Sequence, residues 1–182
     1  MNKKVLVGMA ALAALLAFAP AAQAQETGER AFSLYAGLIV PGVDDLDNDL
    51  TYGLEFDSRP WDSFGWGLSA GMMDLNQNNN EPFTDTFGNA NGYFVDSFLI
   101  WYPAGSNFGI FGGLGFGSVD IDIVGTVTDL SDDSLTYNLG ANYTWNFGEN
   151  YLLRPQVKWR KWDGDRYSKV DEEYTLAFGW RF

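Results

Sequence analysis

The stretch SLTYNLGANYTWNF, residues 134–147, alternates large apolar residues with small or polar ones without a break in phase. One face carries Leu135, Tyr137, Leu139, Ala141, Tyr143, Trp145 and Phe147. The opposite face carries only serine, threonine, asparagine and glycine. Alternation with a period of two is typical of a β-strand whose two faces meet different surroundings. We therefore expect one long two-faced strand here.

The same alternation recurs along the rest of the chain. Further strands are predicted at residues 32–40, 50–57, 64–73, 93–102, 108–118, 153–161 and 174–182. Segment 93–102 is apolar on both sides, and Asp96 sets its phase by opposing Tyr93, Val95, Leu99 and Trp101. The sequence therefore predicts an all-β fold of eight strands.

The connections between these strands alternate between short and long. Three are short and have turn compositions: SRPWDS (58–63), PAGSN (103–107) and GEN (148–150). Four are longer and polar: residues 41–49, 74–91, 119–133 and 162–173. All short turns then lie at one end of an antiparallel sheet. Closing such a sheet into an up-and-down barrel removes its exposed edges.

Alternation alone leaves two barrels open, a soluble one with its apolar face inside and a membrane one with that face against lipid. Three features favour the membrane barrel. An eight-stranded interior is narrow, and the many large rings fit its convex outside better. Aromatic residues gather at the short-turn ends of strands, as in a girdle at a membrane interface. They are Trp61, Phe64, Trp101, Phe108, Trp145, Phe147, Trp180 and Phe182. Short turns at one end and long loops at the other match periplasmic turns and extracellular loops.

The N-terminus reads MNKKVLVGMAALAALLAFAPAAQAQ. Lys3 and Lys4, the apolar run 5–19 and the small residues 22–24 form the pattern of a secretory signal peptide. A membrane helix is the alternative, but the run is short and no stop-transfer pattern follows. We expect a signal peptide at 1–24, a short periplasmic segment at 25–30 and the barrel domain at 31–182.

The composition excludes several kinds of chemistry. The chain has 24 acidic against 11 basic residues, with a net charge of −13, which disfavours nucleic acid or anionic lipid as a partner through general electrostatics. It has no histidine and no cysteine. Catalysis by Ser-His-Asp or Cys-His groups and histidine-based metal sites are therefore excluded. The run GIFGGLGFG (109–117) lacks the ending of a phosphate-binding loop, and small residues facing a lumen explain it better. We expect no cofactor.

Seven charged residues fall on the small, polar face that would line the lumen. They are Glu55, Asp57, Asp96, Arg154, Lys158, Arg160 and Arg181. Charges at membrane depth tend to face an interior and to pair. We expect two layers of ion pairs, with Glu55, Asp57, Arg154 and Arg181 nearer the short turns. Their role is either to brace the lumen or to gate a narrow channel.

The predicted loops are rich in aspartate. Asp44, Asp45, Asp47 and Asp49 lie in the first, and Asp120, Asp122, Asp129, Asp132 and Asp133 lie in or beside the third. Clustered carboxylates can hold Ca²⁺ or Mg²⁺, although no stretch has the spacing of an EF-hand. Two interpretations stay open, a solvated acidic rim and divalent cations that bridge the loops to lipopolysaccharide.

The alternating strands, the girdle and the end YTLAFGWRF (174–182) together resemble the small eight-stranded barrels of the Gram-negative outer membrane, of the OmpA, OmpX and OmpW type. The resemblance implies a location in the outer membrane among phospholipid and lipopolysaccharide. It also implies biogenesis through periplasmic chaperones and the barrel-assembly machinery. The terminal strand resembles the assembly signal of such barrels, carried here by Tyr174, Leu176, Phe178, Trp180 and Phe182.

Two functions follow from the resemblance. The first is a structural or interaction role in envelope integrity and surface display of the loops. The second is a narrow or gated porin-like channel for small or apolar solutes, by a lumen or a lateral route. Enzymes among outer-membrane barrels use a histidine, so no enzymatic activity is expected from this sequence.

Overall fold

The computed structural model describes residues 28–42, 48–75, 90–122, 129–164 and 168–182. Its strands are β1 (Arg30–Val40), β2 (Asp49–Trp61), β3 (Phe64–Leu75), β4 (Ala90–Trp101), β5 (Phe108–Asp122), β6 (Asp129–Tyr143), β7 (Trp145–Phe147), β8 (Tyr151–Asp163) and β9 (Val170–Arg181). A single 3-10 turn, η1 (Pro103–Gly105), joins β4 to β5. Within the described ranges, no helix has the length and apolar character needed to cross a membrane.

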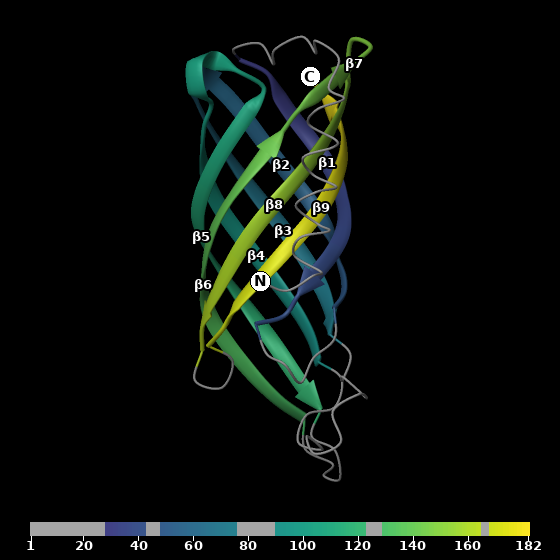
Figure 1. The fold of residues 1–182 in the computed structure, drawn as a ribbon, viewed down its shortest axis with the longest axis vertical. Coiled ribbons are helices and arrows are strands. Elements are labelled where there is room, and N and C mark those ends of the chain that lie inside the picture. Colours follow the sequence, from purple (N-terminus) through teal and green to yellow (C-terminus); the bar gives the residue numbers. More distant parts are fainter. Residues whose placement is uncertain (1–27, 43–47, 76–89, 123–128, 165–167) are drawn as a thin grey trace, which may run out of the picture.

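The strands form one closed antiparallel barrel (Figure 1). Their order is β6-β5-β4-β3-β2-β1-β9-β8-β7, and β6 also pairs with β8. Strands β6 and β7 keep one register against β8, from Leu135–Asp163 to Phe147–Tyr151, so they act as one strand. The barrel therefore has eight strands, as the sequence predicted.

The interruption between β6 and β7 has a local cause in β8. The register places Pro155 opposite Tyr143, and neither residue is paired in this ladder. Proline has no backbone N–H and cannot donate a ladder hydrogen bond. On the other side of the strand, the backbone N–H of Thr144 donates to the carbonyl oxygen of Asn107 at 3.0 Å and continues the pairing with β5. The predicted strand 134–147 is thus correct except for this one-residue break.

The strands are longer than predicted at one end of the barrel, here called the loop end. There β5 continues to Asp122, β6 begins at Asp129, β8 continues to Asp163 and β9 begins at Val170. Much of the predicted loops 119–133 and 162–173 is therefore strand. Backbone pairing can continue above the bilayer, where the outer face no longer needs to be apolar, so a search for apolar alternation ends too early.

The opposite end, here called the turn end, carries the connections 62–63, 102–107 and 148–150. The segment SRPWDS was predicted to be a turn, but residues 58–61 belong to β2. The register shifts between Ser58 and Trp61, as in a β-bulge. β1 begins at Arg30, two residues before the predicted strand 32–40, and the backbone N–H of Gly28 already donates to the carbonyl oxygen of Arg59.

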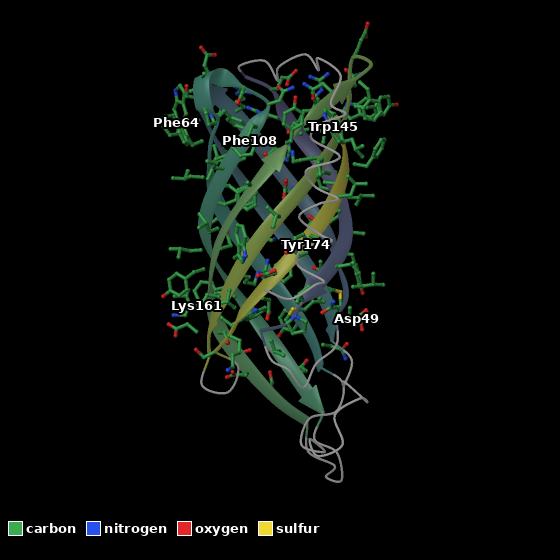
Figure 2. The ribbon with its side chains drawn as sticks, viewed as in Figure 1. Asp49, Phe64, Phe108, Trp145, Lys161 and Tyr174 are labelled. Carbon is green, nitrogen blue, oxygen red and sulfur yellow. The ribbon has the colours of Figure 1, made fainter. Side chains whose placement is uncertain are left out.

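Large apolar side chains cover the outside of the barrel. Exposed ones include Leu34, Leu54, Phe64, Leu99, Phe116, Leu139, Phe178 and Trp180. Phe64, Phe108 and Trp145 all lie toward the turn end, whereas Asp49 and Lys161 lie toward the loop end (Figure 2). An apolar band with aromatic residues at its end is the surface that a lipid-facing barrel presents.

Bulky side chains also fill the lumen, which the sequence predicted to hold glycines and small polar residues. Tyr35, Phe94, Phe98, Phe111 and Trp162 are all buried inside. Glycines on other strands leave room for them. A Cβ atom on Gly71 would collide with the rings of Tyr35 and Phe94, and one on Gly117 would collide with the Trp162 ring. The glycines therefore complement large inward rings instead of lining an open space.

Candidate functional site

The candidate site is the set of charged side chains inside the barrel. All seven residues predicted to line the lumen are buried there, none with more than 7% of its surface exposed. They come from β2, β4, β8 and β9. Because side chains alternate along a strand, Arg154, Lys158 and Arg160 all point inward from β8. The structure separates them into three groups of contacts.

The first group, here called the lower network, is centred on Arg154. Its Nη1 atom lies 2.7 Å from Oε1 of Glu55 and 2.7 Å from Oδ2 of Asp57, both on β2. The Nε atom of Arg154 donates to the hydroxyl of Thr144 at 3.0 Å, and Gln156 donates to both carboxylate oxygens of Glu55. One guanidinium thus neutralises much of the charge of two carboxylates across the lumen.

The second group, here called the upper network, is centred on Asp96 and Glu173. The Nη2 atom of Arg160 lies 2.7 Å from Oδ2 of Asp96 and 3.3 Å from Oε1 of Glu173. The Nζ atom of Lys158 lies 3.2 Å from Oε2 of Glu173 and 3.9 Å from Asp96. The hydroxyls of Thr136 and Ser69 also donate to Asp96. Two cations and two carboxylates therefore balance within this layer.

Aromatic rings pack directly against the upper network. The guanidinium carbon of Arg160 lies 3.2 Å from the centre of the Phe94 ring, and Nζ of Lys158 lies 5.2 Å from the same centre. A cation over a ring face is attracted by the ring quadrupole. Phe94 thus supports two charges of this layer and fills the space beside them.

Arg181 does not join the lower network as predicted. Its Nη1 atom lies 2.7 Å from Oε1 of Glu29, and its Nη2 atom donates to the carbonyl oxygen of Glu149. Arg181 is the last residue of β9, so its side chain reaches the rim of the turn end instead of the layer around Arg154. It joins the end of β9 to Glu29, which precedes β1, and to the connection between β7 and β8.

Arg59 closes the turn end and was not among the predicted residues. Its side chain is buried and donates to the carbonyl oxygens of Asp62 and Ser106, and its guanidinium lies 4.1 Å from the Tyr102 ring centre. Tyr102 follows β4, outside the spanning strands, and burial raises the pKa of its hydroxyl above the ordinary value, so it stays neutral. Together these groups cover the mouth at the turn end.

Glu173 is the other functional residue that the sequence reasoning missed. It lies in VDEE, which was assigned to a loop, although β9 begins at Val170. Extending the alternation of the last strand backwards from Tyr174 would have placed Glu173 inward. Arg59 offered no such signal, because the irregular register between Ser58 and Trp61 breaks the alternation there.

A comparison with protein families identifies the chain. The family model described as outer membrane protein beta-barrel domain matches residues 9–182. The chain belongs to this family. No curated protein matches the sequence. Membership in the family locates the protein in the outer membrane, in contact with its lipids.

Solved structures share this fold at low sequence identity. Ail, the attachment invasion locus protein of Yersinia pestis, is 18% identical with a TM-score of 0.58, covering 86% of this chain and 100% of Ail. OprG from Pseudomonas aeruginosa is 18% identical with a TM-score of 0.55, covering 88% of this chain and 99% of OprG. Neisserial surface protein A is 12% identical with a TM-score of 0.58, covering 85% and 96%. At identities this low, the similarity to these structures shows a common fold alone.

In this family member, the residues predicted to form an assembly signal lie on the outer face of β9. Leu176, Phe178, Trp180 and Phe182 are exposed, whereas Tyr174 is half-buried and donates its hydroxyl to Glu172. Phe178 and Trp180 pack on Tyr151 of β8, with ring centres 5.9 and 5.5 Å apart. β9 is paired to β1 and β8 over its length, which explains how so apolar a terminus is held. Recognition by the assembly machinery stays a prediction.

The predicted acidic loops are only partly described. Asp44, Asp45 and Asp47 lie outside the described residues. Asp49 begins β2, Asp120 and Asp122 belong to β5, and Asp129, Asp132 and Asp133 belong to β6. In the described part of the chain, no three acidic residues gather closely enough to hold a metal ion. Divalent binding stays a hypothesis.

Proposed function

We propose that the protein is a closed structural barrel that contributes to the integrity of the outer membrane and displays the protein's own extracellular loops. We further propose that it does not conduct ions. The burial of the lumen residues carries this proposal. A water-filled pore leaves the side chains that line it exposed to solvent. Arg154, Asp57, Arg160 and Glu173 show no exposed surface at all, although they are charged.

Aromatic and ionic layers together fill the interior. Phe98, Ile100, Tyr102 and Phe111 form one buried apolar cluster, and Phe94, Met73, Val119 and Trp162 belong to a second. Burying a charge in apolar surroundings is costly unless it is paired and hydrogen-bonded. The upper network is balanced in charge, and Arg154 compensates much of the charge of Glu55 and Asp57 in the lower one. Ion-paired networks between apolar clusters therefore favour a brace over a gate.

Conductance of the refolded chain in a planar lipid bilayer tests the proposal. We expect a silent membrane at applied voltages of either sign. Folding has to be confirmed on the same sample by the heat-modifiable mobility of barrel proteins in gel electrophoresis, and a known porin provides the positive control. Discrete, repeatable current steps from the folded protein would contradict a closed lumen and assign the two networks to a gate.

The porin-like function is the second candidate, and the wall of the barrel offers one observation for it. The ladder between β6–β7 and β8 is broken at Pro155. Fewer backbone hydrogen bonds would have to break for these strands to separate at this seam, the boundary between β6–β7 and β8. Apolar solutes could leave the barrel sideways at such a seam. Against this, Thr144 and Pro155 are both buried, so the seam is closed in this structure.

Uptake of a small apolar dye into vesicles separates the two functions. A closed barrel predicts the same uptake rate for vesicles with and without the folded protein. A lateral route predicts faster uptake, and Pro155→Ala, which can restore a ladder hydrogen bond, would slow it. Equal rates for empty, wild-type and variant vesicles are the result we expect.

The proposal includes no catalysis. The sequence lacks histidine and cysteine, and the carboxylates of both networks are engaged by cations. It does include cleavage of a signal peptide after Ala24, a segment that lies outside the described residues. Lipopolysaccharide around the barrel, and chaperones and the assembly machinery during biogenesis, are its proposed partners. The exposed apolar band and the terminal aromatic strand support them.

A further inference from the structure

The basic residues of the chain are distributed very unevenly. No lysine or arginine occurs between Arg59 and Arg154, a stretch that contains β3 to β7. Beyond it, β8 and the segment leading into β9 contain six basic residues: Arg154, Lys158, Arg160, Lys161, Arg166 and Lys169. The loop end therefore has its basic residues on a single hairpin.

Among the described residues at the loop end, Lys161 is the one basic residue whose place in the alternation is outward. Lys158 and Arg160 point into the lumen and are held by Asp96 and Glu173. Lys169 pairs through its backbone with inward-facing Trp162 and lies beside Gly42 at the mouth. Lys161 is exposed and, within the part of the chain that the structure describes, has no ion-pair partner.

The neighbours of Lys161 place it at a membrane interface. It lies directly across from Tyr137 of β6 and Val170 of β9, and Trp159 precedes it on the same face of β8. Tyr137, Trp159 and Val170 are exposed. Lys161 itself lies toward the loop end of the barrel (Figure 2). Tyrosine and tryptophan concentrate at the level of lipid headgroups, where a lysine can reach a phosphate.

Two acidic residues share this face with Lys161: Glu172 of β9 and Asp163, which is two residues further along β8 and exposed. Glu172 pairs with Trp159 in the register and accepts a hydrogen bond from the Tyr174 hydroxyl at 2.8 Å. The carboxylate of Glu172 is thus directed along β9. Within the described residues, neither Glu172 nor Asp163 forms an ion pair with Lys161, so its ammonium group can meet a partner outside the protein.

We propose that Lys161, flanked by Tyr137 and Trp159, binds a phosphate of the glycolipid in the outer leaflet by direct contact. This inference rests on the proposed partnership with lipopolysaccharide and names the residue that makes it. It differs from bridging by divalent cations, because an ammonium group binds phosphate without a metal. A basic residue near an anionic surface contributes about fivefold in affinity.

The test compares lipid binding in nanodiscs that contain diphosphorylated lipid A, or lipid A without phosphates, always in EDTA. Native mass spectrometry gives the affinity of the folded full-length barrel for each lipid. Wild type should prefer the phosphorylated form. Lys161→Gln should weaken its binding about fivefold and leave the other form unaffected, and Lys161→Arg should restore it. Arg30→Gln, which removes an exposed outward cation at the turn end, should change neither affinity.

Three results would overturn the inference. One is equal affinity of wild type and Lys161→Gln for phosphorylated lipid A. Another is a preference that appears only when Mg²⁺ replaces EDTA, which would assign the contact to acidic residues and a metal. The third is an absence of any preference for phosphate in the wild type. None of these results bears on the closed lumen, which the bilayer conductance tests separately.

Discussion

Replacing Arg154 with alanine is expected to lower the free energy of unfolding by about 3–5 kcal/mol, because breaking a buried ion pair leaves uncompensated charge behind. Arg154 has no exposed surface, and a single Nη1 atom holds both Glu55 and Asp57 at 2.7 Å. Without it, two buried carboxylates face each other, and among the described residues Gln156 is the remaining side chain that donates to one of them. Urea unfolding of the protein in lipid vesicles, followed by tryptophan fluorescence, measures the loss.

Neutralising the carboxylates as well provides the control. In Glu55→Gln/Asp57→Asn/Arg154→Met the layer keeps its approximate volume but carries no charge. We expect this triple variant to recover most of the stability lost by Arg154→Ala, since a buried ion pair replaced by neutral groups is often close to neutral in free energy. If the triple variant is as unstable as Arg154→Ala, packing by the arginine stem and not charge compensation holds this layer.

The strands and their inward faces could be predicted because lipid and lumen favour different residue types, which therefore alternate along each strand. Every second residue faces lipid and every other one faces the lumen, so Asp96 alone sufficed to set the phase of β4. The alternation is lost where the two faces of a strand carry similar residues. Residues 171–173 are acidic on both faces of the strand, and the strand that carries Glu173 was therefore cut short at Tyr174.

Pairing inside the lumen could not be predicted from any one strand. Arg154 on β8 reaches Glu55 on β2, and Arg160 on β8 reaches Asp96 on β4, although neither pair of strands is adjacent. Such contacts depend on the tilt and stagger of the whole barrel. The placement of Arg181 beside Glu29 instead of Glu55 has the same origin.

The filling of the lumen by inward aromatic residues also could not be predicted from single strands. Phe94 and Phe98 share the parity of Asp96, so the phase already placed them in the lumen. Their effect on the lumen depends on glycines in other strands. Phe98 lies against Gly67 of β3, and Phe111 lies against Gly140 of β6. Glycine content alone suggested an open interior, whereas the structure shows that rings from other strands take several of these gaps.

Trp162 is expected to be the most important of these rings for stability near the loop end. It is fully buried beside Ile39 and Val119, and its Nε1 atom donates to Oδ2 of Asp171 at 2.8 Å. Asp171 also accepts the backbone N–H of Gly42, so one tryptophan supports the closure of β1, β8 and β9. Trp162→Ala creates a large cavity and removes a hydrogen bond from a buried carboxylate, and should cost about 3–5 kcal/mol.

Trp159, three residues earlier on the same strand, is the matched control for this prediction. Its side chain is 40% exposed on the outer face, so Trp159→Ala leaves no cavity inside the barrel. We expect a loss of less than half that of Trp162→Ala in the same urea titration, because lipid fills the space that the ring leaves outside. Similar losses from the two variants would mean that the interior near the loop end relaxes around the missing ring. The closure there would then depend on the upper network of Asp96, Glu173, Lys158 and Arg160 instead of the aromatic filling.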